Sequence, residues 1–241
     1  MSLKATALKV ITPIGLLTSL LYLQFNNLQT LKASPEQLSP ELLNQQEATI
    51  SLRLSLLKWL PTFGYQNLMA DWTFLNFIQY FGESEERAVA GYGNSPDFFN
   101  VIIGRDPRFI GAYLYLTNTV SVYAGQPQEA IRLMEQGLTA MAPNTPPRSY
   151  LVWRYKGIDE MLFTGDNQAA QQSFKMAAGW ADQSSDDEAA YVAQASRQTA
   201  AFLATDPNSV PALISGWMSV LNRAIDDNVR QEATSRIEAL G

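Results

Sequence analysis

Two stretches of this chain place glycine, alanine and large side chains at the same spacing. GQPQEAIRLMEQGL (125–138) and GDNQAAQQSFKMAA (165–178) each begin with glycine, carry alanine five residues later and a large apolar residue four residues further on. A glycine can end one helix, and a small residue at a fixed distance lets a neighbouring helix approach closely. The two glycines lie 40 residues apart, which is in the range of helical repeats. The pattern therefore predicts stacked helical hairpins.

The rest of the body favours helices that are separated by glycine or proline. Apolar residues recur at helical spacing, and breaks fall at Asp106-Pro107 and Asp206-Pro207 as well as at the two glycines. Helices joined by short turns pack as antiparallel hairpins. We therefore predict an all-α fold, with helices at 96–104, 108–124, 127–142, 150–164, 167–182, 188–204, 209–224 and 228–240.

This pattern resembles the tetratricopeptide repeat family. The residues that match its second-helix signature are Gly125, Ala130, Met134, Gly137 and Pro143 in one repeat, and Gly165, Ala170, Phe174 and Ala177 in the next. The resemblance covers residues 107–182, with degenerate repeats implied at 65–106 and 186–240. The stretch FGYQNLMADWTFLNFIQYFG is also similar to membrane-anchored bacterial proteins of this family. The resemblance implies a superhelix with a concave groove lined by the first helix of each pair.

The same resemblance implies which residues line the groove. Grooves of this family hold extended peptides or partner helices. The candidates are Tyr115, Thr119 and Val122 from one repeat and Tyr155, Asp159 and Leu162 from the next, with Arg154 as the alternative if the register shifts by one residue. Family members that capture a C-terminal carboxylate use lysine and asparagine at such positions, so the residues found here argue against that mode.

The N-terminus predicts a membrane anchor. No charged residue lies between Lys9 and Lys32, and the apolar centre runs from Val10 to Phe25. A helix of about 18 residues is about 27 Å long, slightly shorter than the roughly 30 Å hydrocarbon core of a bilayer. Lys4 and Lys9 favour a cytoplasmic N-terminus, with the body in the periplasm or an equivalent lumen. The alternatives are a cleaved signal peptide with secretion, a buried helix, and a body on the cytoplasmic face.

Between the anchor and the repeats we expect a polar tether. The predicted organisation is an anchor at 1–32, a tether at 33–58 and a repeat domain at 59–241. Near the end of the tether, ISLRLSLL (50–57) alternates apolar and polar residues as a strand does, but no second convincing strand accompanies it. This stretch is consistent with either extended packing or a lone edge strand.

The aromatic-rich segment 65–81 is predicted to be a core helix. Asp71 would be costly inside a bilayer, which argues against a second membrane span, and we expect it to be a buried structural acid. The segment 82–96, rich in glycine and charge, is expected to be a loop. The apolar residues at helical spacing in the predicted core helix are Leu68, Trp72, Leu75 and Ile78.

The composition excludes several kinds of chemistry. The chain has no histidine and no cysteine, which excludes Ser-His and Cys-His nucleophile pairs, thiolate nucleophiles and ordinary zinc or haem sites. Its net charge of −6 disfavours nucleic acid as a partner. Neighbouring residues of a helix diverge by about 100°, so the acidic clusters do not form a two-carboxylate site by themselves. These clusters, expected to be solvated or to cap helices, are Glu83/Glu85/Glu86, Asp159/Glu160, Asp186/Asp187/Glu188 and Asp226/Asp227.

Together these features favour an interaction protein over an enzyme. We expect a membrane-tethered scaffold or assembly factor for a membrane protein complex, which binds a peptide or helix in the groove without a cofactor. One alternative is a carboxylate-dependent enzyme that acts on cell-wall glycan. Another is a lipid- or pigment-binding protein that uses the aromatic helix.

Overall fold

The computed structural model describes residues 39–241, together with Thr18 and Tyr22, and this part of the chain is all-α. No β-strand occurs in the described residues, in agreement with the helical spacing of the sequence. None of the helices described there combines the length and the apolar character needed to cross a bilayer. The predicted anchor, apart from Thr18 and Tyr22, and the first residues of the predicted tether lie outside the described residues.

The helices follow one another through short connections. The stretch 50–57 is helical and belongs to α2, and the expected loop at 82–96 contains α4. Because the alternating stretch has no strand to pair with, its backbone groups are satisfied within a helix. The elements are α2 (Pro40–Trp59), α3 (Gln66–Gly82), α4 (Ser84–Ala90), α5 (Ser95–Arg105), α6 (Ile110–Leu116), η2 (Thr117–Tyr123), α7 (Pro127–Leu138), α8 (Tyr150–Asp159), η3 (Glu160–Thr164), α9 (Asn167–Ala181), α10 (Ala189–Leu203), α11 (Val210–Leu221) and α12 (Asp227–Glu238).

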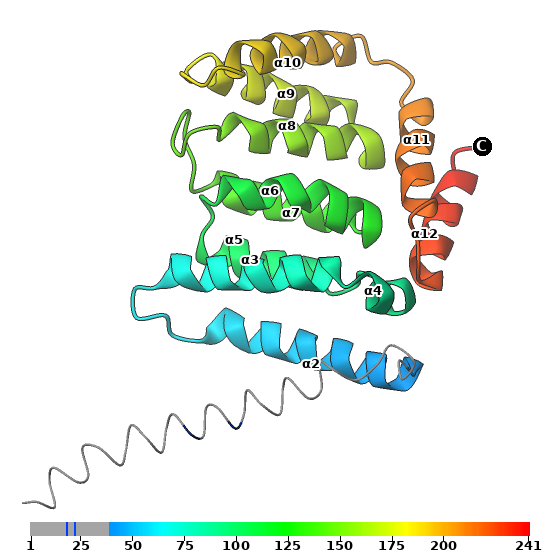
Figure 1. The fold of residues 1–241 in the computed structure, drawn as a ribbon. Helices are drawn as coiled ribbons and strands as arrows, with labels where there is room; N and C mark the ends of the chain where they lie inside the picture. Colours follow the sequence, from blue (N-terminus) through cyan, green and yellow to red (C-terminus); the bar gives the residue numbers. More distant parts are fainter. Residues whose placement is uncertain (1–17, 19–21, 23–38) are drawn as a thin grey trace, which may run out of the picture. The chain divides into compact units, whose positions relative to one another are not determined.

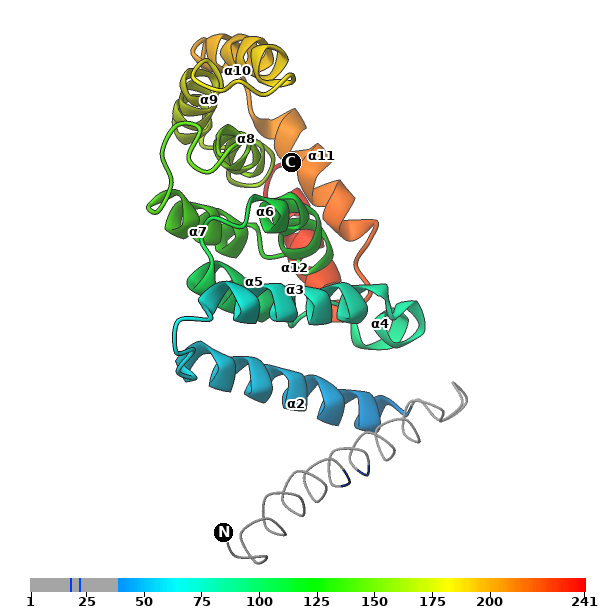
Figure 2. The same cartoon turned by 60° about the vertical axis from the view of Figure 1, so that its left-hand side comes forward.

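Helices α3 to α10 form a stack (Figure 1). α3 packs on α5, η2 on α7, α8 on both α7 and α9, and α9 on α10. The π-helical turns η2 and η3 continue α6 and α8 without a break, and each leads into the next helix through a short turn. Figure 2 shows α7 and α9 along one side of the stack and α6 and α8 along the other. The helices that precede the two turns therefore share one side of the stack.

The two glycines that begin the repeated pattern lie where the backbone turns between helices. Gly125 has a φ angle of 64° and Gly165 has a φ angle of 68°. Both values lie in the left-handed region, which glycine adopts without the steric cost that a Cβ atom imposes. The wide turns that precede them are closed by hydrogen bonds from Ala124 N to Thr119 O (3.0 Å) and from Gly165 N to Glu160 O (3.1 Å). The spacing in the sequence thus marks equivalent turns.

A third glycine of the pattern permits close packing between α6 and α7. A Cβ atom added to Gly137 would lie 1.7 Å from the hydroxyl oxygen of Tyr113. Tyr113 is fully buried, and its hydroxyl donates a hydrogen bond of 2.7 Å to the Pro107 carbonyl oxygen. Because that hydrogen bond fixes the ring, only glycine fits at residue 137.

We expect Ala130→Leu and Ala170→Leu each to lower the free energy of unfolding by about 1–3 kcal/mol. Both alanines are fully buried at positions where α7 and α9 contact their neighbours, so the larger side chain overpacks the contact. Chemical denaturation measures the effect. The matched controls are Gln128→Leu and Gln172→Leu, because both glutamines lie on the exposed sides of the same helices. If both alanine variants unfold like the unmodified protein, the close packing of the repeats is refuted.

The last two helices do not extend the stack. α11 leaves the end of α10 and packs on η3, η2 and α12, across the ends of the stacked helices (Figure 1). A Cβ atom added to Gly216 of α11 would lie 2.2 Å from the carbonyl oxygen of Leu162 in η3, so the two backbones nearly touch. Of the degenerate repeat expected at 186–240, only α10 therefore lies in the stack, because α11 folds back over the stacked helices.

Helix α2 belongs to the same compact unit as the later helices, although a tether was expected as far as residue 58. The unit begins at Pro40. Arg87 of α4 is almost completely buried; it pairs with Glu47 of α2 at 2.5 Å and donates a hydrogen bond of 2.7 Å to the Gly91 carbonyl oxygen. Its guanidinium carbon lies 4.0 Å from the ring centroid of Tyr80 in α3. This buried ion pair ties α2 to α3 and α4.

Candidate interaction surface

The seven residues predicted to line a groove occupy equivalent places in two helices. Tyr115, Thr119 and Val122 lie on α6 and η2, and Arg154, Tyr155, Asp159 and Leu162 lie on α8 and η3. Their exposure differs widely: Thr119, Val122 and Asp159 are buried, Arg154, Tyr155 and Leu162 are half-buried, and Tyr115 is 36% exposed. The structure therefore does not bring them together as one accessible groove.

The chain's own helix α11 covers the two aliphatic members of this set. Val122 is buried in a cluster with Trp217 and Phe163, and Leu162 packs against the same cluster. The rings of Phe163 and Trp217 meet edge to face, with their centroids 5.7 Å apart. Val122 is thus a core residue and Leu162 a half-buried neighbour of the cluster that holds α11, so neither lines an open groove in this arrangement.

Two polar members of the set are also buried. The Thr119 hydroxyl donates a hydrogen bond of 2.8 Å to the Tyr115 carbonyl oxygen in its own helix. Asp159 has no exposed surface and accepts a hydrogen bond of 2.6 Å from the Ser121 hydroxyl of η2. Burial raises the pKa of the Asp159 carboxyl to about 7, and the hydrogen bond from Ser121 opposes the rise. Asp159 is therefore neither a groove residue nor a solvated acid.

Arg154 and Tyr155 are held between helices. The Arg154 guanidinium donates a hydrogen bond of 3.3 Å to the Ser196 hydroxyl of α10. Tyr155 packs against the main core, and burial raises the pKa of its hydroxyl. The candidate that remains clearly at the surface is Tyr115, whose ring lies edge to face with Phe74 of α3 at a centroid distance of 5.4 Å.

Lys156, Glu160 and Ser173 form a buried polar cluster between α8, η3 and α9. The Lys156 ammonium group pairs with Glu160, and the Ser173 hydroxyl donates a hydrogen bond of 2.6 Å to the other Glu160 oxygen. Lys156 also lies 3.3 Å from a carboxylate oxygen of Glu135, which is exposed. Because Glu160 and Ser173 are buried, a substrate cannot reach them without separating these helices. Glu160 was expected to be solvated or to cap a helix. The expectation that it is solvated is wrong, because its side chain is buried, as is that of Asp159.

One of the other acidic clusters contains a helix-capping residue, as predicted. Asp226 accepts a hydrogen bond of 2.9 Å from Val229 N at the start of α12. Asp186 accepts a hydrogen bond of 3.0 Å from Glu188 N in the turn before α10, but no side chain caps α10 itself. Among the residues that the structure describes, no group of acidic side chains is arranged to hold a metal ion.

The aromatic-rich segment forms helix α3 as predicted, but with its faces reversed. The predicted core residues lie on the exposed side of α3: Leu68, Trp72, Leu75 and Ile78. Its buried side is made by Ala70, Thr73, Phe77 and Tyr80. Phe77 packs on Phe99 of α5, with ring centroids 4.7 Å apart. Asp71 is exposed as well, so its predicted role as a buried structural acid is wrong.

The exposed side of α3 continues onto α6. We call this surface the α3–α6 face and define it by Leu75, Ile78, Leu114 and Tyr115, all of which are exposed. The contact of the Tyr115 ring with Phe74 and Phe77 joins the two helices beneath it. Scattered apolar side chains are normal on a protein surface, but a contiguous group of large ones marks an interaction site. The sequence identified Tyr115 and missed its neighbours on α3.

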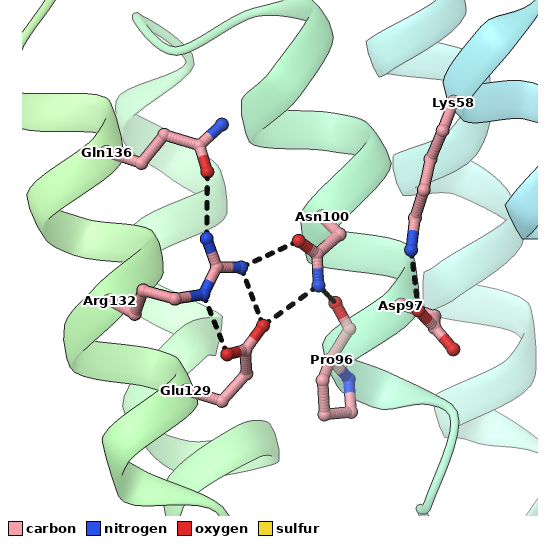
Figure 3. Close-up of polar contacts among 7 residues, drawn as sticks. All are labelled: Lys58, Pro96, Asp97, Asn100, Glu129, Arg132 and Gln136. Carbon is pink, nitrogen blue, oxygen red and sulfur yellow. Dashed lines mark hydrogen bonds and ion pairs between the residues drawn. The ribbon is translucent and has the colours of Figure 1, made fainter.

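The α5–α7 side of the stack has a different character, because its polar groups bind one another (Figure 3). Arg132 of α7 binds Glu129 through two nitrogen atoms, at 2.8 and 2.6 Å, and donates a hydrogen bond of 2.7 Å to Asn100 of α5. The hydrogen bond from Arg132 lowers the pKa of Glu129. Lys58 and Asp97, 2.8 Å apart, link α2 to α5 nearby. This network connects helices of the same chain and offers a partner little apolar area.

A small pocket lies between α2 and α3. Its volume is about 170 Å³, and its walls include Leu54, Leu57, Trp72, Tyr80 and Phe98. Sites for drug-sized ligands usually measure about 300–1,000 Å³. The pocket is therefore too small to enclose a pigment or a lipid chain.

No protein-family model matches the chain, and neither the curated proteins nor the solved structures that were searched contain a match. The resemblance to tetratricopeptide repeats therefore stays a prediction. The functional proposal therefore depends on the exposed surface of the helical stack.

Proposed function

We propose that this protein is a membrane-tethered helical scaffold that binds a partner protein on the α3–α6 face. The observation that carries the proposal is the group of four large apolar and aromatic side chains exposed on adjacent helices. Leu75, at 63% exposure, lies among them without a role in the core of this chain. Aromatic side chains such as Tyr115 are also enriched among residues that dominate binding energy.

The chemistry of the face favours an apolar helix of the partner as the bound element. Leu75 and Ile78 are three residues apart on α3, so they form a ridge on one side of the helix. A ridge of this kind packs against the apolar stripe of another helix. Asp71 and Asn76 flank the ridge and supply a polar rim.

The tether in the proposal rests on the sequence. The run from Val10 to Leu31 carries no charge and has Lys4 and Lys9 before it, which is typical of an anchor with a cytoplasmic N-terminus. A body held at the membrane meets partners that are themselves membrane proteins, and we therefore propose subunits of a membrane protein complex as its partners.

Crosslinking in intact membranes tests the proposal. A photo-activated amino acid at Leu75 should capture a protein that the same group at Tyr191 does not capture, because Tyr191 is exposed on α10 at 74% but lies outside the α3–α6 face. Mass spectrometry of the product identifies the partner. Equal capture profiles at the two positions would argue against a specific surface on α3 and α6.

With the partner identified, we expect Leu75→Gln and Tyr115→Ala each to weaken its binding by about 2 kcal/mol, or roughly 30-fold in Kd. Both changes remove apolar area from the centre of the face. Calorimetry with the purified partner measures the affinity, and Tyr191→Ala is the matched control. Leu75→Gln should leave the melting temperature almost unchanged, since Leu75 is exposed. Undiminished binding by both variants would refute the α3–α6 face as the binding surface.

A further inference from the structure

A second exposed apolar surface lies on the outward side of α2 and on the loop that follows. We call it the α2 face and define it by Leu52, Leu56, Trp59, Leu60 and Phe63. Trp59 and Phe63 are each 87% exposed. We infer that this face rests in the headgroup region of a lipid bilayer, an inference that relies on the tether of the proposed function.

The loop after α2 exposes its aromatic side chains. Phe63 has a φ angle of 49°, in the left-handed region that bulky side chains rarely adopt. The turn is closed by a hydrogen bond of 2.8 Å from Tyr65 N to Thr62 O. With this backbone the Phe63 ring stands at the tip of the turn, where 87% of the residue is exposed. The loop thus presents Phe63 as a preformed apolar projection.

Arg105 of α5 fixes the start of this loop. One of its guanidinium nitrogens donates hydrogen bonds to the carbonyl oxygens of Leu57 (2.6 Å), Lys58 (3.0 Å) and Leu60 (2.8 Å). These carbonyl groups lie at the end of α2, where a helix leaves its last acceptors unpaired. The projection is therefore attached rigidly to the stack, so little side-chain or loop entropy is lost when it inserts into a lipid surface.

The charge distribution suits an anionic lipid surface. The whole chain carries a net charge of −6, yet between residues 42 and 70 it has a single acid, Glu47, and two bases, Arg53 and Lys58, of which Lys58 is paired with Asp97 of α5. Glu47 is paired with the buried Arg87, so its charge is neutralised inside the fold. Anionic headgroups repel an acidic body but attract a basic side chain beside an apolar face, and Arg53 is the base on α2 that has no acidic partner in the ion pairs of the described residues. The α2 face is thus a region of this acidic chain that can approach such a surface.

The kinds of side chain and the chain connection agree with this placement. Tryptophan and tyrosine are enriched at membrane–water interfaces, and Trp59 and Tyr65 are exposed at the end of α2 and the start of α3. Eight residues, 32–39, separate the end of the uncharged run from Pro40. Eight extended residues reach at most about 28 Å, so an anchored chain keeps the start of α2 close to the membrane.

A fluorescent label tests the inference on the full chain in vesicles of phosphatidylcholine and phosphatidylglycerol. Because the chain has no cysteine, Thr62→Cys gives one labelling site beside Phe63 and leaves the α2 face intact. Phe202→Cys is the matched control, since Phe202 is an exposed apolar residue on α10, at the other end of the stack (Figure 1). We expect nitroxide-labelled lipids to quench the label at residue 62 several-fold more strongly. Adding Trp59→Ser and Phe63→Ser should reduce that quenching to the level of the control.

Vesicle flotation separates this inference from the proposed tether. If the chain floats with the vesicles but the two labels are quenched equally, the tether is supported and the membrane contact of α2 is overturned. A label at residue 62 that is shielded from aqueous iodide but not quenched by lipid also overturns it, and indicates that a second copy, a partner or the N-terminal segment covers the face. A chain that does not float overturns both the tether and the inference.

Discussion

Trp217→Ala is expected to lower the free energy of unfolding by about 3–5 kcal/mol, the range for truncating a buried aromatic side chain. Trp217 is almost completely buried where α11 crosses η2 and η3, against Val122 and Phe163. The truncation leaves a cavity that the neighbours cannot fill, because the Gly216 backbone already touches the Leu162 carbonyl group. Chemical denaturation of the unmodified and variant proteins measures the loss.

A matched control uses the next residue of the same helix. Met218 points away from the contact and is 39% exposed, so Met218→Ala should change the free energy of unfolding by less than about 1 kcal/mol. Hydrogen exchange adds a local measurement: in Trp217→Ala, amides of α11 and α12 should exchange faster than those of α7 and α9. Equal losses for the two variants would mean that α11 is not held by this cluster.

The helices could be predicted where glycine or proline punctuates the chain. The prediction of 167–182 differs by one residue from α9 (Asn167–Ala181), because Gly165 precedes the helix and the apolar spacing inside it is regular. The small residues Ala130 and Ala170 could be assigned to contacts between helices because they follow these glycines at the same spacing. These are local signals, which depend on residues that are close in sequence.

The buried side of α3 could not be predicted, because two different sets of its residues recur at helical spacing, each forming a stripe along one side of the helix. Leu68, Trp72 and Leu75 make the more apolar stripe, and hydrophobicity alone places them inside. The stripe that is buried combines the small residues Ala70 and Thr73 with the aromatic residues Phe77 and Tyr80. Which stripe faces inward depends on α5, α2 and α6, and a residue pattern within α3 carries no information on those neighbours.

The position of α11 also depends on contacts that are distant in sequence. Its helix was predicted, but its return across η2 and η3 was not, and this return buries Val122 and half-buries Leu162. One signal was present. A glycine inside a helix costs about 1 kcal/mol relative to alanine, so Gly216 in the middle of an apolar helix indicates close backbone contact. Of the predicted groove residues, Tyr115 belongs to the proposed binding surface because α11 does not reach it.

The second large effect is expected from Asp159→Asn, as a change in how stability depends on pH. Burial raises the pKa of Asp159 from 3.8 to about 7 in the folded protein, and the nearby Glu160 adds to the rise. At pH values between 3.8 and about 7, the Asp159 carboxyl is deprotonated in the unfolded chain and protonated in the folded chain. Stability contributed by the neutral carboxyl is therefore complete below pH of about 4, falls as the pH rises, and is lost above about 7.

A rise of about three units corresponds to roughly 4 kcal/mol. Asparagine has nearly the same shape, carries no proton that titrates in this range and can still accept the hydrogen bond from Ser121. We therefore expect Asp159→Asn to unfold like the unmodified protein near pH 4 and to be more stable than it at pH 8, by up to this amount. The difference between the two free energies of unfolding, measured by denaturation across this pH range, isolates Asp159 from the other acids.

Ser121→Ala is the opposing control: it removes a hydrogen bond that stabilises the charged carboxylate, so it should lower stability more at pH 8 than at pH 4. A constant difference between Asp159→Asn and the unmodified protein across the range would show that Asp159 does not hold its proton in the folded chain.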